Sequence, residues 1–305
     1  MNSSGPEDQR GGARGLNAAL SALRPKQWSK NVFVFAALIF ARQWSNGSAI
    51  AGTLAAFAAM SLAGSATYLL NDLVDQKADQ AHPRKRLRPI ASGRVSLQTA
   101  IGMSIFCAGA AIGIAFQFGI LPVILGYLGL QLLYNWRLKR EAVADVVTIA
   151  FGFVLRVVAG ALAISAPVSA WILLCTGFLA LLLGFGKRRH ELRLIGENGG
   201  TRVALGGYTE GSIDLFLGVS AAAAILSYAV YSIESTTARM FPGLFLTTPF
   251  VGYGVFRYLL LVQSPEVGGE PEHVIFGDPQ LIVVLLGFLA TAFAALSGFH
   301  PAIIR

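Results

Sequence analysis

The sequence contains little charge: Asp, Glu, Lys and Arg make up 13% of its 305 residues, whereas soluble domains average about 25%. Apolar side chains make up 54% of the residues, and the mean hydropathy is +0.61. Apolar runs of about 20 residues, the length of a membrane-spanning helix, recur along the chain. The composition therefore excludes an ordinary soluble enzyme and predicts an all-α, polytopic membrane protein.

Cysteine is also scarce. Cys107 and Cys175 are the two cysteines of the chain, and both fall inside apolar runs, so neither a disulfide framework nor a cysteine metal site is expected. Residues 1–23 are polar and glycine-rich, and they lack the apolar core of a signal peptide; we expect a disordered tail. Residues 24–305 hold no polar segment long enough for a soluble domain, so we expect one transmembrane domain there.

About nine membrane-spanning helices are expected, bundled around a cavity that opens to the cytoplasm. The first and fourth of them are short. The apolar runs lie near residues 31–47, 48–70, 96–118, 121–136, 144–166, 168–186, 213–234, 241–263 and 279–298.

Basic residues gather in alternate connections between these runs. With the N-terminus inside, the positive-inside rule places those connections in the cytoplasm of an inner-membrane protein, and the opposite side carries little beyond Arg42, Arg239 and Arg305. Membrane insertion and anionic lipid headgroups explain most of the net charge of +8. We therefore expect the lipid bilayer, and no nucleic acid, among the partners.

An acidic stretch, "NDLVDQKAD", follows the second apolar run directly. If the helix continues, Asn71, Asp72, Asp75 and Asp79 fall within roughly 100° of one another on one face. Crowded carboxylates repel unless a cation lies among them, and an all-oxygen ligand set suits magnesium. We predict that Asp72, Asp75 and Asp79 bind Mg²⁺ carrying a diphosphate, and that Asn71 ligates or orients. The alternative is a solvated helix end with ordinary negative charge.

The next segment, "HPRKRLRP", is strongly basic. Pro83 and Pro89 break helices, so this segment is predicted to be a loop. Arginine forks match phosphate oxygens, and we take Arg84, Lys85 and Arg88 as phosphate-binding candidates. The alternative is that these charges only set the membrane topology.

Together, "NDLVDQKAD" and "HPRKRLRPIASG" resemble the NDxxDxxxD motif and following loop of the UbiA superfamily of intramembrane transferases. That resemblance implies a helical membrane fold and diphosphate binding through Mg²⁺. Prenyltransferases of the superfamily carry a second aspartate motif after the sixth span, where this chain reads "GKRRHELRL". Lys187 and Glu191 occupy the two spaced positions, so a second magnesium would be held poorly and a phosphate held well.

Further stretches resemble the decaprenyl-phosphate phosphoribosyltransferase branch of that superfamily. They are "LRPKQWSKN" (23–31), "YNWRLKREAVADVVTIAFGFVLRVVAGA" (134–161), "GKRRHEL" (186–192), "GGYT" (206–209) and "GGEPEHVIFGDPQL" (268–281). The branch implies that phosphoribosyl pyrophosphate is the donor and that a polyprenyl (decaprenyl) phosphate is the acceptor.

Arg156 stands out because it lies deep in the fifth apolar run, where an arginine costs roughly 2.5–3.5 kcal/mol on insertion scales. Asp145 precedes it on nearly the same helix face. Arg156 either partners buried polar groups or lines the substrate pocket. Tyr134, at the end of the fourth run, is a further pocket candidate.

The resemblance and the residues together predict catalytic roles for Asp72, Asp75 and Lys187. Lys187 and Arg188 are expected to bind the donor's 5-phosphate, while Lys26, Lys30 and the basic loop offset the charge of the lipid phosphate. The predicted substrate-binding residues are Lys26, Lys30, Asn71, Arg84, Lys85, Arg88, Tyr134, Arg156, Arg188 and Glu191.

The predicted reaction is phosphoribosyl transfer to the polyprenyl phosphate, as a step toward lipid-linked ribose or arabinose donors for surface or exported glycans and glycolipids. One alternative is a prenyltransferase that acts on an aromatic acceptor, which Lys187 disfavours because such enzymes use aspartate there. Another is a transporter or lipid-binding protein without chemistry, which has little need for a magnesium cluster. The sequence does not decide whether the protein forms a homo-oligomer.

Overall fold

The computed structural model describes residues 17–83, 85–198, 203–264 and 271–299. Within these ranges the chain is helical and contains no β-strand. Seven segments are long and apolar enough to cross a membrane. They comprise α3 (Gly47–Val74), α5 (Leu97–Gln117), α7 (Ala144–Ala163), α8 (Ala170–Asn198), α9 (Glu210–Glu234), the segment Pro242–Gln263 and α13 (Pro279–Leu296).

The segment Pro242–Gln263 consists of the 3₁₀-helix η5 (Pro242–Thr247) and α11 (Thr248–Gln263). Short helices connect the spans or cap their ends: α4 (Gln76–Ala81), η2 (Lys85–Leu87), η3 (Leu138–Arg140), η4 (Val203–Gly207), α10 (Thr236–Met240) and α12 (Pro271–Gly277).

The two spans expected to be short are the two that are not among these seven segments. The fourth is α6 (Leu121–Trp136), whose 16 residues reach about 24 Å. The first is the 3₁₀-helix η1 (Pro25–Phe35) followed by α2 (Ala36–Phe40). A 3₁₀-helix rises about 2 Å per residue, so this pair still spans about 30 Å, the thickness of a bilayer core. The prediction of roughly nine helices in a polytopic all-α protein is confirmed.

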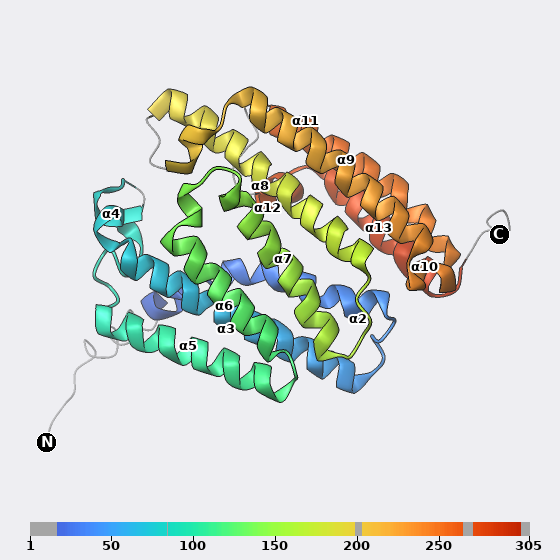
Figure 1. Cartoon of the computed structure of the whole chain (residues 1–305), viewed down its shortest axis with the longest axis horizontal. Helices are drawn as coiled ribbons and strands as arrows, with labels where there is room; N and C mark the ends of the chain where they lie inside the picture. Colours follow the sequence, from blue (N-terminus) through green and yellow to red (C-terminus); the bar gives the residue numbers. More distant parts are fainter. Residues whose placement is uncertain (1–16, 84, 199–202, 265–270, 300–305) are drawn as a thin grey trace, which may run out of the picture.

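The helices form two groups that meet along α7 and α8 (Figure 1). The earlier group contains α3, α5, α6 and α7, and the later group contains α8, α9, α11 and α13. Alternating helix directions place the end of α3, the start of α7 and the end of α8 at the same edge of the bundle. The polar segments between the spans are thereby gathered at that edge.

Small residues line the inside of the bundle, and large apolar residues face outward. On α3 the side chains of Ala56, Ala59 and Ala63 are fully buried, whereas Phe106 and Phe116 on α5 are more than 70% exposed. This inversion is expected where lipid surrounds the helices and close backbone approach holds them together. It confirms that the chain is a multi-pass membrane protein.

A close backbone approach joins η1 to α7. A Cβ at Gly160 would overlap the carbonyl oxygen of Val34, so a residue without a side chain is required there. Gly52 of α3 similarly lies against the backbone of Ala163 at the end of α7. These glycines let η1, α3 and α7 pack closely toward the edge of the bundle opposite the polar one.

Helix starts follow local side-chain chemistry. The N-cap side chains of α3, α5, α9 and α13 each accept a hydrogen bond from a backbone N–H of the first turn, which satisfies donors that lack a partner within the helix. These residues are Asn46, Ser96, Thr209 and Asp278.

The expected disordered tail needs a correction at its end. Residues 17–22 are helical, and the buried side chains of Ala18 and Ala22 pack in one cluster with Leu69 and Ile90. Alanine spacing of four residues gives this turn an apolar face, which the polar composition of the segment as a whole concealed. Residues 1–16 lie outside the described residues.

Candidate active site

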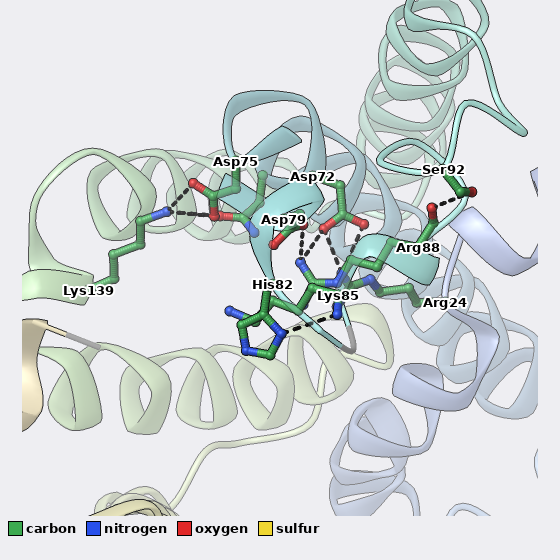
Figure 2. A network of polar contacts seen from close by, with 10 residues as sticks. Arg24, Asp72, Asp75, Asp79, His82, Lys85, Arg88, Ser92 and Lys139 are labelled. Carbon is green, nitrogen blue, oxygen red and sulfur yellow. Dashed lines mark hydrogen bonds and ion pairs between the residues drawn. The ribbon is translucent and has the colours of Figure 1, made fainter. Parts of the chain in front are cut away.

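The acidic stretch lies where α3 ends. The α-helix stops at Val74, and Asp75 joins it to α4 with φ −87° and ψ 3°. The helix therefore does not continue without interruption, as the single-face prediction had assumed. Instead of one row, the four polar side chains form two pairs, each in contact with a cation. Figure 2 shows the three aspartates with these cations.

The first pair consists of Asp72 and Asp79, which are both buried. Arg88 Nη1 lies between them, 3.1 Å from Asp72 Oδ1 and 2.6 Å from Asp79 Oδ2. Arg24 Nη2 contacts both oxygens of Asp72, at 2.6 and 2.9 Å. Two carboxylates from different helices thus share one cationic nitrogen (Figure 2).

The second pair consists of Asn71 and Asp75. Lys139 Nζ, from η3 after the fourth span, lies 3.2 Å from Asn71 Oδ1 and 3.1–3.2 Å from the two Asp75 oxygens. The Asp75 side chain is one-third exposed, in contrast to the buried Asp72. The end of α3 therefore presents two neighbouring positions at which oxygen ligands surround a cation.

These positions fit a divalent metal in ligand chemistry. Carboxylate and amide oxygens are the ligands that magnesium prefers. At both positions these oxygens already stabilise a positive charge, that of Arg88 or that of Lys139. In the part of the chain that the structure describes, no three His, Cys, Asp or Glu side chains converge as a ready metal site. The expected three-aspartate magnesium site therefore stays a prediction, and it requires displacement of at least one internal cation.

The basic loop folds back over the acidic stretch. Lys85 is half-buried in η2, and its backbone N–H donates to His82 Nδ1. Arg94 Nη2 donates to the carbonyl of Leu87 and closes the loop. Arg88 is the member of this loop that reaches the carboxylates, and Arg84 lies outside the described residues.

A second polar cluster joins α7, α8 and Tyr208, which lies between η4 and α9. The side chains of Asp145 and Arg188 are 0% and 1% exposed, and Arg188 Nε lies 2.7 Å from Asp145 Oδ2. Arg188 also pairs with Glu191, one turn further along α8. Tyr208 donates its hydroxyl to Asp145 Oδ1 at 2.9 Å. Burial and the neighbouring carboxylate raise the pKa of Tyr208, which keeps the phenol protonated as a donor.

The remaining predicted residues are distributed around these clusters. Lys187 and Glu191 are half-buried on α8, Lys30 is half-buried on η1, and Lys26 is exposed there. Tyr134, at the end of α6, interacts electrostatically with Arg188 and with Tyr68 of α3. It therefore lies near one residue of the second cluster, Arg188, and near α3.

Arg156 does not pair with Asp145, although the two share a helix face. Its Nε donates to Asn31 Oδ1 at 2.7 Å, and its Nη2 donates to the Tyr127 hydroxyl at 3.3 Å. Arg156 is 7% exposed, and it lies over the rings of Tyr127 and Phe153.

The residues of these networks that sequence reasoning missed include Arg24, Lys139 and Tyr208, and also Asn31 and Tyr127, which contact Arg156. Arg24 and Lys139 belong to the basic segments before and between the apolar runs, and nothing in the local pattern shows which aspartate a distant cation contacts. Tyr208 lies in the recognised "GGYT" stretch, which could have identified it.

The family model described as the UbiA prenyltransferase family matches residues 31–191. The decaprenyl-phosphate phosphoribosyltransferase of Mycolicibacterium smegmatis is 32% identical over 297 residues, covering 92% of this chain and 93% of the relative. The enzyme of the same name from Corynebacterium glutamicum is 34% identical over 280 residues, covering 88% and 84%.

A solved UbiA homologue from Archaeoglobus fulgidus, bound to GPP and Mg²⁺, superposes with a TM-score of 0.68 at 19% identity, covering 92% of this chain and 99% of the homologue. At that identity the superposition shows the fold alone, and the fold agrees with the family model and with both relatives. The chain therefore belongs to the UbiA prenyltransferase family, in the branch of the decaprenyl-phosphate phosphoribosyltransferases.

Proposed function

We propose that the protein transfers the 5-phosphoribosyl group of phosphoribosyl pyrophosphate to a polyprenyl (decaprenyl) phosphate and releases pyrophosphate. Similarity along most of the chain to enzymes named for decaprenyl-phosphate phosphoribosyl transfer supports this activity. The observation that carries it is the end of α3, where Arg88 is held between Asp72 and Asp79 and Lys139 is held by Asn71 and Asp75. A site that already stabilises two cations among oxygens is suited to a metal–diphosphate.

Mg²⁺ is the proposed cofactor, with Asp72, Asp75 and Asp79 as its ligands and Asn71 as a ligand or orienting group. When bound, it would stabilise negative charge on the departing diphosphate. The displaced side chains of Arg88 and Lys139 would then offer N–H donors to the same diphosphate, since both already reach the carboxylates.

In the reaction, an oxygen of the lipid phosphate attacks C1 of the ribose. A C–O bond forms to the lipid phosphate, and the C1–O bond to the diphosphate breaks, with its electron pair leaving on pyrophosphate. Inversion at C1 is expected. Because the attacking oxygen is already ionised at neutral pH, the chain needs no general base.

Lys187 is proposed to bind the 5-phosphate of the donor. Arg188, named for the same task, is engaged with Asp145 and Glu191, so its charge is largely compensated. We assign Arg188 the additional role of fixing Glu191 and the start of α7. Lys26, Lys30 and Lys85 would offset the repulsion between two anionic substrates.

The proposed location is the inner membrane, with the N-terminus and the polar edge in the cytoplasm, where a soluble sugar phosphate is available. The one-sided distribution of basic residues supports this orientation. The product, a polyprenyl phosphoribosyl phosphate, would supply lipid-linked ribose or arabinose donors for surface or exported glycans and glycolipids.

The test uses purified protein in detergent with Mg²⁺, ribose-labelled phosphoribosyl pyrophosphate and a polyprenyl phosphate. We expect label to enter the organic phase only when all components are present. Absence of such label, together with prenylation of an aromatic acid from a prenyl diphosphate, would replace this proposal with an aromatic prenyltransferase.

A further inference from the structure

Arg156 is a buried cation whose charge no carboxylate balances in the described part of the chain. It is the thirteenth residue of α7, about 18 Å along the helix from its start. The carboxylate nearest along that helix, Asp145, is engaged with Arg188 and Tyr208. The groups that do contact Arg156 are the neutral side chains of Asn31 and Tyr127.

Such a charge is expensive in the interior of a membrane protein. Burial removes the guanidinium from water, and amide, phenol and aromatic partners return only part of the lost solvation. The rings of Phe153 and Tyr127, with centroids 4.9 and 5.3 Å from the guanidinium carbon, stabilise the cation without neutralising it. An arginine kept under these conditions is suited to an anion that arrives from outside the chain.

One end of the guanidinium is available for that anion. Nε and Nη2 of Arg156 are used by Asn31 and Tyr127, whereas Nη1 has no hydrogen-bond partner among the described residues. Nη1 lies beside Gly152, where a Cβ would be 3.2 Å from it. Two nitrogens of the guanidinium are thus held by the protein, and the third lies next to a residue that has no side chain.

The position also connects to the acidic stretch. Arg24, which contacts Asp72, lies over the ring of Tyr68 at 5.0 Å. Tyr68 in turn interacts electrostatically with both Arg24 and Arg156. Because Arg156 lies about 18 Å along α7 from the polar edge, it is on the membrane-interior side of the proposed donor site, and Tyr68 lies near both arginines.

We infer that Arg156 binds a phosphate oxygen of a substrate inside the helix bundle. This inference rests on the proposed function and specifies one contact within it. The shared chemistry is a phosphate monoester, which both substrates contain: the lipid acceptor as its headgroup and the soluble donor as its 5-phosphate. The depth of Arg156 within the membrane-spanning helix α7 favours the headgroup of the lipid.

The test measures binding by the thermal shift of detergent-purified protein, without turnover. Wild type and Arg156→Gln are titrated with farnesyl phosphate alone, and separately with phosphoribosyl pyrophosphate plus Mg²⁺. We expect Arg156→Gln to bind farnesyl phosphate 10- to 100-fold more weakly, with unchanged binding of the soluble donor. Loss of donor binding instead would identify the 5-phosphate as the source, and wild-type binding of both probes would overturn the inference.

Two further variants separate binding from structure. Asn31→Ala removes the Nε contact and retains the guanidinium, so it should lower the melting temperature but reduce farnesyl phosphate binding less than Arg156→Gln. Equal losses in both variants would mean that Arg156 only braces η1, and would overturn the inference. Arg257→Gln, which removes a cation paired with Asp278, controls for loss of positive charge.

This inference can fail without the proposed function, and the reverse also holds. If wild type transfers label to lipid while Arg156→Gln binds both probes normally, the inference is wrong and the activity stands. If wild type binds farnesyl phosphate through Arg156 but transfers no label, the activity is wrong and the phosphate site stands.

Discussion

Replacing Asp145 with alanine should destabilise the protein strongly, because it leaves a buried arginine without its main partner. The side chains of Asp145 and Arg188 are 0% and 1% exposed, and they are joined at 2.7 Å. Breaking a pair of this kind by removing one partner costs about 3–5 kcal/mol. Glu191 still contacts Arg188, so the lower end, about 3 kcal/mol, is expected.

The assay is reversible unfolding in mixed micelles with increasing SDS, comparing wild type, Asp145→Ala, Arg188→Met and the double variant. The double variant should be more stable than Asp145→Ala alone, because it no longer buries an unpaired charge. A destabilisation below about 1 kcal/mol for Asp145→Ala, or additive effects in the double variant, would refute the buried pair as the link between α7 and α8.

The remaining predictions concern the proposed active site. Asp75→Asn should abolish transfer while the variant stays folded in detergent by circular dichroism, and a wild-type rate would remove Asp75 from the metal site. Lys139→Met should lower the Mn²⁺ concentration needed for half-maximal binding, seen by electron paramagnetic resonance, because the ammonium no longer competes for Asp75; weaker binding would mean that Lys139 organises the site instead. Lys187→Ala should raise KM for phosphoribosyl pyrophosphate about tenfold, the effect of losing roughly 1.4 kcal/mol, with little change for the lipid. The control variant Arg257→Gln should alter neither KM. A larger effect of Lys187→Ala on the KM for the lipid than on the KM for the donor would reverse the assignment of the two phosphates.

Helical structure could be predicted because apolar length and helix-capping residues are local signals. The runs that became α5, α7 and α13 are long, and Ser96 and Asp278 mark the starts of α5 and α13. The break at Asp75 could not be predicted in this way, since "NDLVDQKAD" contains no proline or glycine. The ion pair between Asp75 and Lys139 accompanies it, and Lys139 is 64 residues away in sequence.

The candidate site was predictable in its residue types and less so in its pairings. The acidic stretch, the basic loop and Lys187 carry local patterns that indicate phosphate chemistry. That Arg88 lies between Asp72 and Asp79, or that Asp145 pairs with Arg188 and leaves Arg156 to Asn31, depends on how η1, α3, α7 and α8 pack. Charge periodicity along one helix contains no information on such pairings.

The most direct measurement follows the two halves of the donor at once. Phosphoribosyl pyrophosphate labelled with ¹⁴C in the ribose and ³²P in the β-phosphate is incubated with the protein, Mg²⁺ and decaprenyl phosphate. We predict that ¹⁴C enters the organic phase while ³²P stays in water as pyrophosphate, in equal molar amounts. Transfer of ³²P to the lipid, or retention of both labels in water, would contradict phosphoribosyl transfer by this protein.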